Sequence, residues 1–190
     1  MSAVEATEAT FERDVVERSR ELPVVVDFWA DWCAPCHMLT PVLEDEVEKR
    51  GGAIALVKVD TDANQELSTR YGISGIPAVK AFRNGHVVSE FVGAQPRQAV
   101  AEFLDAFTRP TEAEELLAEL RESDELPDVV EALDAEDYER ALEALLARAE
   151  QTSGDERDRV RQVMLAVFEH LGPENPLTVR FRRRLATILY

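Results

Sequence analysis

The two cysteines of this 190-residue sequence, Cys33 and Cys36, stand three positions apart with Ala34 and Pro35 between them. Two sulfur atoms at this spacing can form a disulfide bond and, once reduced, exchange it with another molecule. The reacting form is a thiolate, which attacks a disulfide sulfur, while the second thiol attacks the mixed disulfide and releases the product. We interpret the pair as a redox-active disulfide that needs no bound cofactor.

The same two sulfur atoms would also be half of a zinc site, so a metal has to be considered. A structural zinc ion takes four ligands, which leaves two to be found elsewhere in the chain. The histidines of the sequence are His37, His86 and His170, and nothing pairs them at ligand spacing. We therefore expect no metal at the cysteines.

The sequence around the cysteines predicts that Cys33 opens a helix. Apolar residues recur at helical spacing from Cys36 to Arg50, and Gly51-Gly52 ends the pattern. At a helix N-terminus, free N–H groups stabilise an anion and lower a cysteine pKa from about 8.5 to roughly 3.5–7.5. Cys33 is then the attacking sulfur, Cys36 lies one turn further in, and Pro35 fits the first turn because its φ is already helical.

An aspartate interrupts the apolar run that precedes the cysteines. Residues 24–29 are otherwise β-branched and aromatic, which predicts a strand buried on both faces, so Asp27 is expected to be buried. A buried carboxylate has a raised pKa and can shuttle a proton. It can equally cap a neighbouring backbone group, and the pattern alone leaves both roles open.

The elements that would position these residues alternate between strand and helix up to about residue 107. Asn84-Gly85 is a strong hairpin signal between two of the strands. This order predicts an α/β unit with a mixed central sheet flanked by helices. The predicted strands are 24–29, 53–60, 78–83 and 86–92, and the predicted helices are 8–20, with Thr7 as N-cap, 36–50, 61–71 and 96–107.

The pattern changes at Arg109-Pro110, after which no strand pattern returns. We therefore predict two domains, 1–109 and 110–190, the second all-α and built of short antiparallel helices joined by brief loops. The predicted helices are 112–121, 127–134, 136–150, 156–171 and 176–189.

Composition limits the partners and the compartment. A net charge of −17 argues against nucleic acid, and no apolar run approaches the roughly 20 residues of a membrane helix. Residues 111–156 carry 17 acidic and 3 basic side chains, which we interpret as a solvated face. The start of the sequence lacks a basic segment followed by an apolar one, and the two cysteines are closely spaced, so a reducing, cytoplasmic location is expected.

The segment Asp27-Phe28-Trp29-Ala30-Asp31-Trp32-Cys33-Ala34-Pro35-Cys36 resembles the active-site strand and turn of the thioredoxin family. Four further features resemble the family in order and spacing, so the first 105 or so residues are expected to adopt the thioredoxin fold. These are Pro41 in the active-site helix, Gly75-Ile76-Pro77, Phe82-Arg83-Asn84-Gly85 and Val92-Gly93-Ala94.

The resemblance implies roles for individual residues. Asp27 would accept a proton from Cys36 during attack, with Lys58 as the lysine that accompanies it. Pro77 would be cis and would place the backbone of Ile76 beside Cys33, ready to pair with an extended substrate. The implied substrate-binding residues are Trp32, Ala34, Pro35, Gly75, Ile76 and Pro77. For Trp32 and Ile76 ordinary core packing is the alternative, and for Trp29 core support is the expected role.

Two positions beside the sulfur atoms depart from the best-known thioredoxins. Ala34 stands where those proteins have glycine, and His37 where they have lysine. Both residues neighbour the cysteines, so the reduction potential can differ from that of thioredoxin, about −270 mV. A neutral His37 would support a Cys33 thiolate less than a lysine does, and a protonated one would restore the effect.

The second domain resembles helical repeats. Residues 133–142 resemble the turn and second helix of a tetratricopeptide repeat, in which Tyr138 would fill the gap between small residues. Residues 163–177 and 182–186 resemble the C-terminus of bacterial thioredoxin–tetratricopeptide proteins called chaperedoxins. Those proteins combine a holdase with redox protection of clients, and some pass clients to a chaperonin through their final helix. The present tail is shorter by about one repeat.

Two hypotheses for the function follow. One is a disulfide reductase for client proteins, recycled by a flavoprotein such as thioredoxin reductase. The other is a redox-protective holdase or co-chaperone, with a chaperonin as a possible partner. The alternative for the tail is a cap that stabilises the chain, oligomerises it or docks a partner. Docking would use basic and apolar residues of the last helix, namely Arg182, Arg183, Arg184, Leu185, Ile188 and Leu189.

Overall fold

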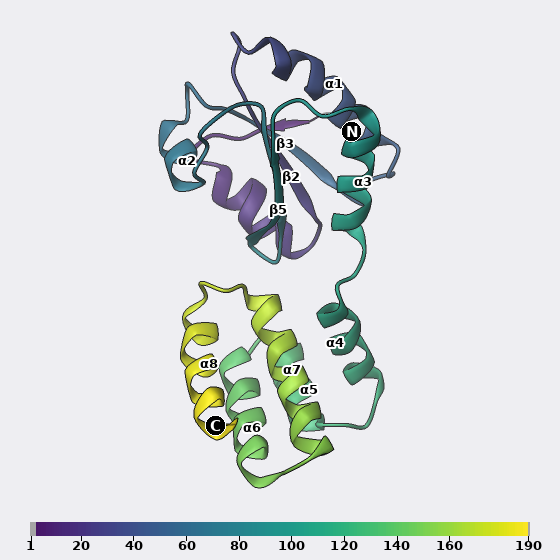
Figure 1. The fold of residues 1–190 in the computed structure, drawn as a ribbon, viewed down its shortest axis with the longest axis vertical. Coiled ribbons are helices and arrows are strands. Elements are labelled where there is room, and N and C mark those ends of the chain that lie inside the picture. Colours follow the sequence, from purple (N-terminus) through teal and green to yellow (C-terminus); the bar gives the residue numbers. More distant parts are fainter. Residues whose placement is uncertain (1–2, 190) are drawn as a thin grey trace. The chain divides into compact units, whose positions relative to one another are not determined.

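The computed structural model describes residues 3–189, with the backbone alone for Leu189, and it divides into two compact units. We call Met1–Arg109 the N-terminal unit and Pro110–Tyr190 the C-terminal unit. The buried apolar clusters fall within one unit or the other, so each unit has a hydrophobic core of its own. Figure 1 shows the helices and strands of both units.

The N-terminal unit is built on a mixed five-stranded sheet, which confirms the predicted fold. The strand order is β1-β3-β2-β4-β5. Strands β1, β3 and β2 are parallel to one another, and β4 pairs antiparallel with both of its neighbours, β2 and β5. The edge strand β1 was not predicted, because two residues are too short to show a period. The strands are β1 (Val4–Glu5), β2 (Val24–Trp29), β3 (Ala55–Asp60), β4 (Ala78–Arg83) and β5 (His86–Val92).

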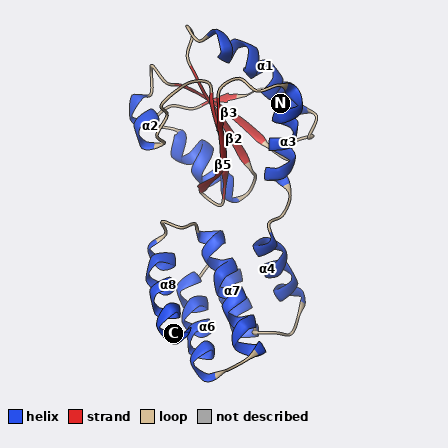
Figure 2. Cartoon of the chain, in the orientation of Figure 1, coloured by secondary structure: helices blue, strands red, loops and turns tan. Residues whose placement is uncertain are grey.

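Helical segments cover both faces of this sheet (Figure 2). Val24, Val26 and Phe28 of β2 pack in one core with residues of the first helical segments and α2. Val25 faces the opposite side and packs in a second core with residues of α1 and α3. The strand is therefore buried on both faces, as its apolar run predicts. The segments are η1 (Glu12–Glu17), η2 (Arg18–Arg20), α1 (Ala34–Glu48), α2 (Gln65–Arg70) and α3 (Arg97–Thr108).

Two of the predicted helices differ in the structure. Residues 8–20 were predicted as one helix, but η1 is a π-helix and η2 a short 3-10 turn. The segment still buries Phe11, Val15 and Val16 as its spacing indicates. The helix predicted over 61–71 begins only at Gln65, because Asp60 accepts a hydrogen bond from the backbone N–H of Asp62 and holds the preceding residues in a turn.

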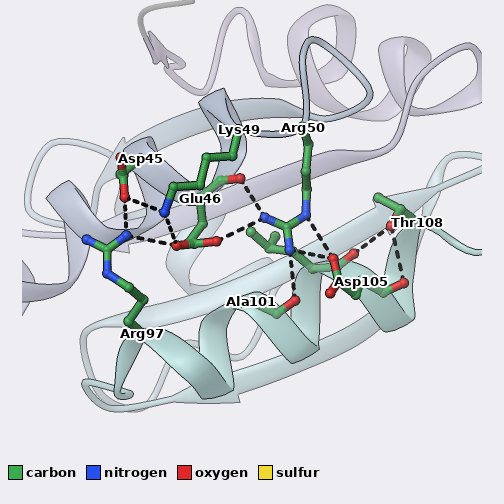
Figure 3. Close-up of polar contacts among 9 residues, drawn as sticks. Asp45, Glu46, Lys49, Arg50, Arg97, Ala101, Asp105 and Thr108 are labelled. Carbon is green, nitrogen blue, oxygen red and sulfur yellow. Dashed lines mark hydrogen bonds and ion pairs between the residues drawn. The ribbon is translucent and has the colours of Figure 1, made fainter.

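A network of ion pairs fastens α1 to α3 (Figure 3). Glu46 of α1 is 6% exposed and accepts hydrogen bonds from Lys49, Arg50 and Arg97. Arg50 also donates to Asp105 at 2.5 Å and to a backbone carbonyl of α3. These cations lower the pKa of Glu46 to about 2, the contribution of Lys49 being the largest. The network holds the helix that carries the cysteines, and no motif in the sequence indicates it.

The C-terminal unit is all-helical over its described residues, which confirms the prediction. α4 packs on α7, α5 on α6, and α6 on both α7 and α8. Its core includes the fully buried Leu142, Phe168 and Phe181. The start of α6 is two residues later than predicted, because Asp137 accepts the backbone N–H of Arg140 and caps it there. The helices are α4 (Glu112–Glu122), α5 (Pro127–Asp134), α6 (Tyr138–Gln151), α7 (Asp155–Leu171) and α8 (Pro176–Leu189).

Candidate active site

Cys33 and Cys36 form a disulfide bond at the N-terminus of α1. Cys33 is the N-cap residue, and its sulfur accepts a hydrogen bond from the backbone N–H of Cys36 at 3.3 Å. Pro35 lies in the first turn, where no helical partner is needed for the N–H that proline lacks. When the bond is reduced, the same N–H and the positive end of the helix are placed to stabilise a thiolate at Cys33.

The two sulfurs differ in what can reach them. Cys33 is 3% exposed, whereas Cys36 is completely buried, so an incoming disulfide can meet only Cys33. Trp32, immediately before it, is 70% exposed, and its indole N–H donates to Asp62 at 2.8 Å. This bond fixes a large apolar ring at the surface beside the reactive sulfur. Core packing is therefore excluded as the role of Trp32.

The loop before β4 lies against the cysteines. The Ile76-Pro77 peptide bond is cis, as the resemblance to thioredoxin implies. Ile76 is half-buried and packs against the small apolar cluster that contains Cys33 and Cys36, while Pro77 is buried. Gly75, Ala34 and Pro35 are exposed around the same site. The residues predicted to bind substrate are thus brought together at one end of the sheet.

Asp27 is fully buried in the central strand β2. One carboxylate oxygen, Oδ2, accepts a hydrogen bond from the hydroxyl of Thr40 at 2.7 Å. The pKa of Asp27 is raised to about 6, chiefly by burial; the hydrogen bond from Thr40 and the positive charge of Lys58 lower it, and the negative charge of Glu44 raises it slightly, so that burial outweighs the two lowering effects. The carboxyl group therefore changes its charge close to neutral pH, as a proton shuttle requires.

Lys58 is the register partner of Asp27 on the neighbouring strand β3. Its ammonium group lies over the ring of Trp29, 4.6 Å from the centroid. The cation is thus held near the carboxylate by an aromatic face, and its charge favours the ionised form of Asp27. Trp29 is half-buried and packs against the small apolar cluster that contains Cys33 and Cys36, in line with the core support expected of it.

His37 makes a defined contact beside the cysteines. Its Nε2 lies 2.7 Å from the carbonyl oxygen of Asp31, and since a carbonyl can only accept, Nε2 carries a proton. The imidazole ring meets Trp29 edge to face, with 6.2 Å between the ring centroids. The histidine is therefore fixed by the turn that precedes Cys33.

Sequence reasoning missed two residues of the site, Thr40 and Asp62. Neither residue stands out in the sequence. A threonine inside a helix normally hydrogen-bonds a backbone carbonyl of its own helix, and Asp62 lies in a polar turn typical of any surface loop. The position of Thr40 four residues after Cys36 places both on one face of α1, which is the clue that spacing offered.

The residues predicted to dock a partner divide into two groups. Arg182, Arg183 and Arg184 are exposed, although Arg184 is paired with Glu143 of α6 at 2.5 Å. Leu185 is 4% exposed within the core of the C-terminal unit, and Ile188 packs against that core. Leu185 is therefore not available to a partner, because it already supports α8, whereas a docking role for the half-buried Ile188 stays a prediction. The side chain of Leu189 lies outside the described residues.

Over residues 3–189, no group of three or more His, Cys, Asp and Glu side chains is placed to hold a metal ion. Within the same range, no helix has the length and apolar character needed to span a bilayer.

A dithiol–disulfide pair at a helix N-terminus, with an exposed indole beside one sulfur and a buried acid hydrogen-bonded to the same helix, defines a protein-disulfide oxidoreductase. Comparison with known proteins gives its family. The chain belongs to the thioredoxin family, whose sequence pattern matches residues 2–106. The redox centre of this family is the disulfide itself.

Three relatives show the extent of the similarity. Thioredoxin 1 of Nostoc sp. is 39% identical over 101 residues, which is 53% of this chain and 92% of the relative. Thioredoxin 1 of Synechococcus elongatus is 42% identical over 99 residues, or 52% and 91%. Thioredoxin of Bacillus subtilis is 39% identical over 102 residues, or 54% and 94%. A second family, the tetratricopeptide repeat, matches residues 129–190, which span most of the C-terminal unit.

Proposed function

We propose that this protein reduces disulfide bonds in client proteins, with the N-terminal unit as redox domain and the C-terminal unit as a repeat domain that binds protein partners. The observation that carries the proposal is the disulfide capping α1, with 3% exposure at Cys33, none at Cys36 and 70% at Trp32. Only the sulfur of Cys33 can react directly with a client disulfide, and an apolar surface for a polypeptide lies next to it.

The reaction follows from this asymmetry. In the reduced protein the Cys33 thiolate attacks a client disulfide, forming a mixed disulfide and releasing one client thiolate. Cys36 then gives its proton to Asp27, and its thiolate attacks the sulfur of Cys33. The internal disulfide re-forms and the second client thiolate leaves. Two electrons have passed to the client, and a flavoprotein reductase of the thioredoxin reductase type would return the pair to the dithiol.

Insulin reduction by dithiothreitol tests this function. The native protein should accelerate the precipitation of insulin, and Cys33→Ser should abolish the acceleration because the attacking sulfur is gone. Cys36→Ser is the matched control: it should still attack but remain trapped as a mixed disulfide with insulin. Equal rates for native protein and Cys33→Ser would refute catalytic exchange.

We also propose a holdase or co-chaperone role for the C-terminal unit, in a reducing, cytoplasmic compartment. The match to tetratricopeptide repeats over 129–190 supports a protein-binding role. Among the described residues of this unit, the large apolar side chains that are exposed are Leu165 and Val179, which lie on α7 and α8. Suppression of the aggregation of heat-treated citrate synthase by Cys33→Ser would support the holdase without its redox chemistry, and failure of both Cys33→Ser and the native protein would remove it.

Partner docking is the alternative for the helical unit, and the exposed arginines of α8 favour an acidic partner, a chaperonin among the candidates. Reversing two of these charges with Arg182→Glu and Arg183→Glu should reduce capture of the chaperonin in a pull-down. Reversing Arg157 and Arg161 of α7 changes the net charge equally and should leave capture intact. Equal capture by both variants would count against docking through α8.

A further inference from the structure

Thr40 of the N-terminal unit makes a buried hydrogen bond to Asp27 that has no part in the exchange reaction described above. It is buried in α1, at 9% exposure, and its hydroxyl donates to Oδ2 of Asp27 at 2.7 Å. A threonine inside a helix commonly donates to the carbonyl four residues earlier, within its own helix. The hydroxyl of Thr40 instead donates to a residue of β2, so the hydrogen bond joins helix α1 to the sheet.

The bond places the carboxyl group of Asp27 relative to the second cysteine. Cys36 and Thr40 are four residues apart in α1 and are both buried, so they share one face of the helix. Because Thr40 contacts Asp27 directly, the carboxyl group lies against the helix face that also carries Cys36. The fixed position of the acid therefore depends on a side chain one turn beyond the sulfur.

The two oxygens of Asp27 differ as a result. Oδ2 is occupied by the Thr40 hydroxyl, whereas Oδ1 is buried and has no hydrogen-bond partner among the described residues. A buried polar oxygen without a partner is unfavourable, most of all when it is charged, and protonation relieves this. Oδ1 is therefore the oxygen available to take up a proton.

Few groups besides Thr40 act on the proton affinity of Asp27. Lys58 faces the carboxylate from β3, Glu44 acts on it from α1, and the register partner on β4 is the apolar Val79. In such an apolar setting a single hydrogen bond from a hydroxyl is strong because little water screens it.

We propose that Thr40 is a positioning residue for thiol–disulfide exchange, which holds Asp27 through Oδ2 so that Oδ1 receives the proton of Cys36. This inference rests on the proposed function and adds a residue to it. It predicts that the hydroxyl of Thr40, and not its methyl group, sets the proton affinity of Asp27 and the pH dependence of the second chemical step.

The test compares three variants of the full chain. Thr40→Val keeps the shape and removes the hydroxyl, Thr40→Ala removes the hydroxyl without adding bulk, and Thr40→Ser keeps it. The protonation of Asp27 is followed in the oxidised protein by carbon NMR of its carboxyl group. The midpoint should rise by about one pH unit in Thr40→Val and Thr40→Ala, a roughly tenfold change in proton affinity, and stay near the native value in Thr40→Ser.

Insulin reduction over pH 5–8 supplies the second readout. The rising limb of the rate profile should move upward with the midpoint, so that the hydroxyl-free variants lose several-fold in rate near pH 6.5 while Thr40→Ser retains it. A native protein without reductase activity would defeat the proposed function itself. An active native protein whose hydroxyl-free variants keep the native midpoint and profile, or a Thr40→Ser protein that behaves like Thr40→Val, would overturn the role of the hydroxyl. If Thr40→Val does not fold, Thr40→Ala and Thr40→Ser decide the matter.

Discussion

Replacing Asp27 by asparagine should stabilise the N-terminal unit at neutral pH. The carboxyl group is fully buried, and its pKa is raised from 3.8 to about 6. Because the folded state holds this proton more tightly than the unfolded chain, the protonated Asp27 contributes to the stability of the fold. This contribution is fully present below about pH 4 and is lost as the pH rises through about 6. A shift of this size corresponds to about 3 kcal/mol in the free energy of unfolding.

Asparagine removes the charge but keeps the size of the side chain and an oxygen for Thr40. Any fixed effect of its buried amide is the same at every pH, so the informative quantity is the change in the difference between variant and native protein. About 2 kcal/mol of the gain should accrue between pH 4 and pH 7. The carboxylates of the α1–α3 network titrate in both proteins, and their contributions cancel in the difference.

Tryptophan fluorescence during urea unfolding of the oxidised proteins measures the effect. Both tryptophans, Trp29 and Trp32, lie in the N-terminal unit, so the signal reports that unit even if the other one unfolds separately. Keeping the disulfide formed holds the unfolded state constant between the two proteins. A stability difference that stays flat from pH 4 to pH 7 would refute the reasoning, since the charge of Asp27 would then cost nothing in the fold.

Three further changes test the rest of the structure. Glu46→Gln should lower the stability of the N-terminal unit by about 1 kcal/mol near pH 6, because the depressed pKa of Glu46 stabilises the fold at pH values above its ordinary pKa of 4.5. This contribution is lost as the pH falls toward 2, so urea unfolding should show a smaller difference from the native protein at pH 3 than at pH 6. Gly85→Ala should cost about 1–2 kcal/mol in the same assay, because φ at Gly85 is +85°, and an unchanged midpoint would show that the hairpin relaxes. Phe181→Ala, in the core of the C-terminal unit, should lower the stability of that unit by about 3–5 kcal/mol. The loss of helix followed by circular dichroism should then begin at a lower temperature, while the transition followed by tryptophan fluorescence stays in place; a common shift of both signals would contradict separate cores.

The fold was predictable where the chain alternates or repeats over a long enough stretch. β2, β4 and β5 have the predicted bounds, because apolar runs and the Asn84-Gly85 turn mark them on both sides. The helices of the C-terminal unit lie within a few residues of their predicted bounds, because apolar residues recur there at helical spacing. β1 and the π-helical form of η1 were missed, since both depend on contacts with the rest of the unit and leave no period of their own.

The candidate site was predictable in its sulfur chemistry and less so in its electrostatics. The spacing of Cys33 and Cys36 predicts thiol–disulfide exchange, and an aspartate inside an apolar strand predicts a buried acid. Thr40 could not be found in this way, because its hydroxyl bonds to a strand 13 residues earlier, and only the packing of α1 on the sheet brings the two together. The error at Leu185 has a related cause: an apolar residue beside arginines reads as a docking patch until the neighbouring helix is seen to cover it.

These observations connect the stability of the redox domain to its chemistry. An ionised Asp27 opposes folding by about 3 kcal/mol above pH 6, and a chain selected for stability alone would not keep it. Locally unfavourable residues of this kind are expected where a protein needs them for function. Asp27→Asn should therefore gain stability and lose insulin reductase rate together at pH 7. A variant that gained the stability and kept the full rate would show that Cys36 gives up its proton by another route, and the buried acid would then need a different explanation.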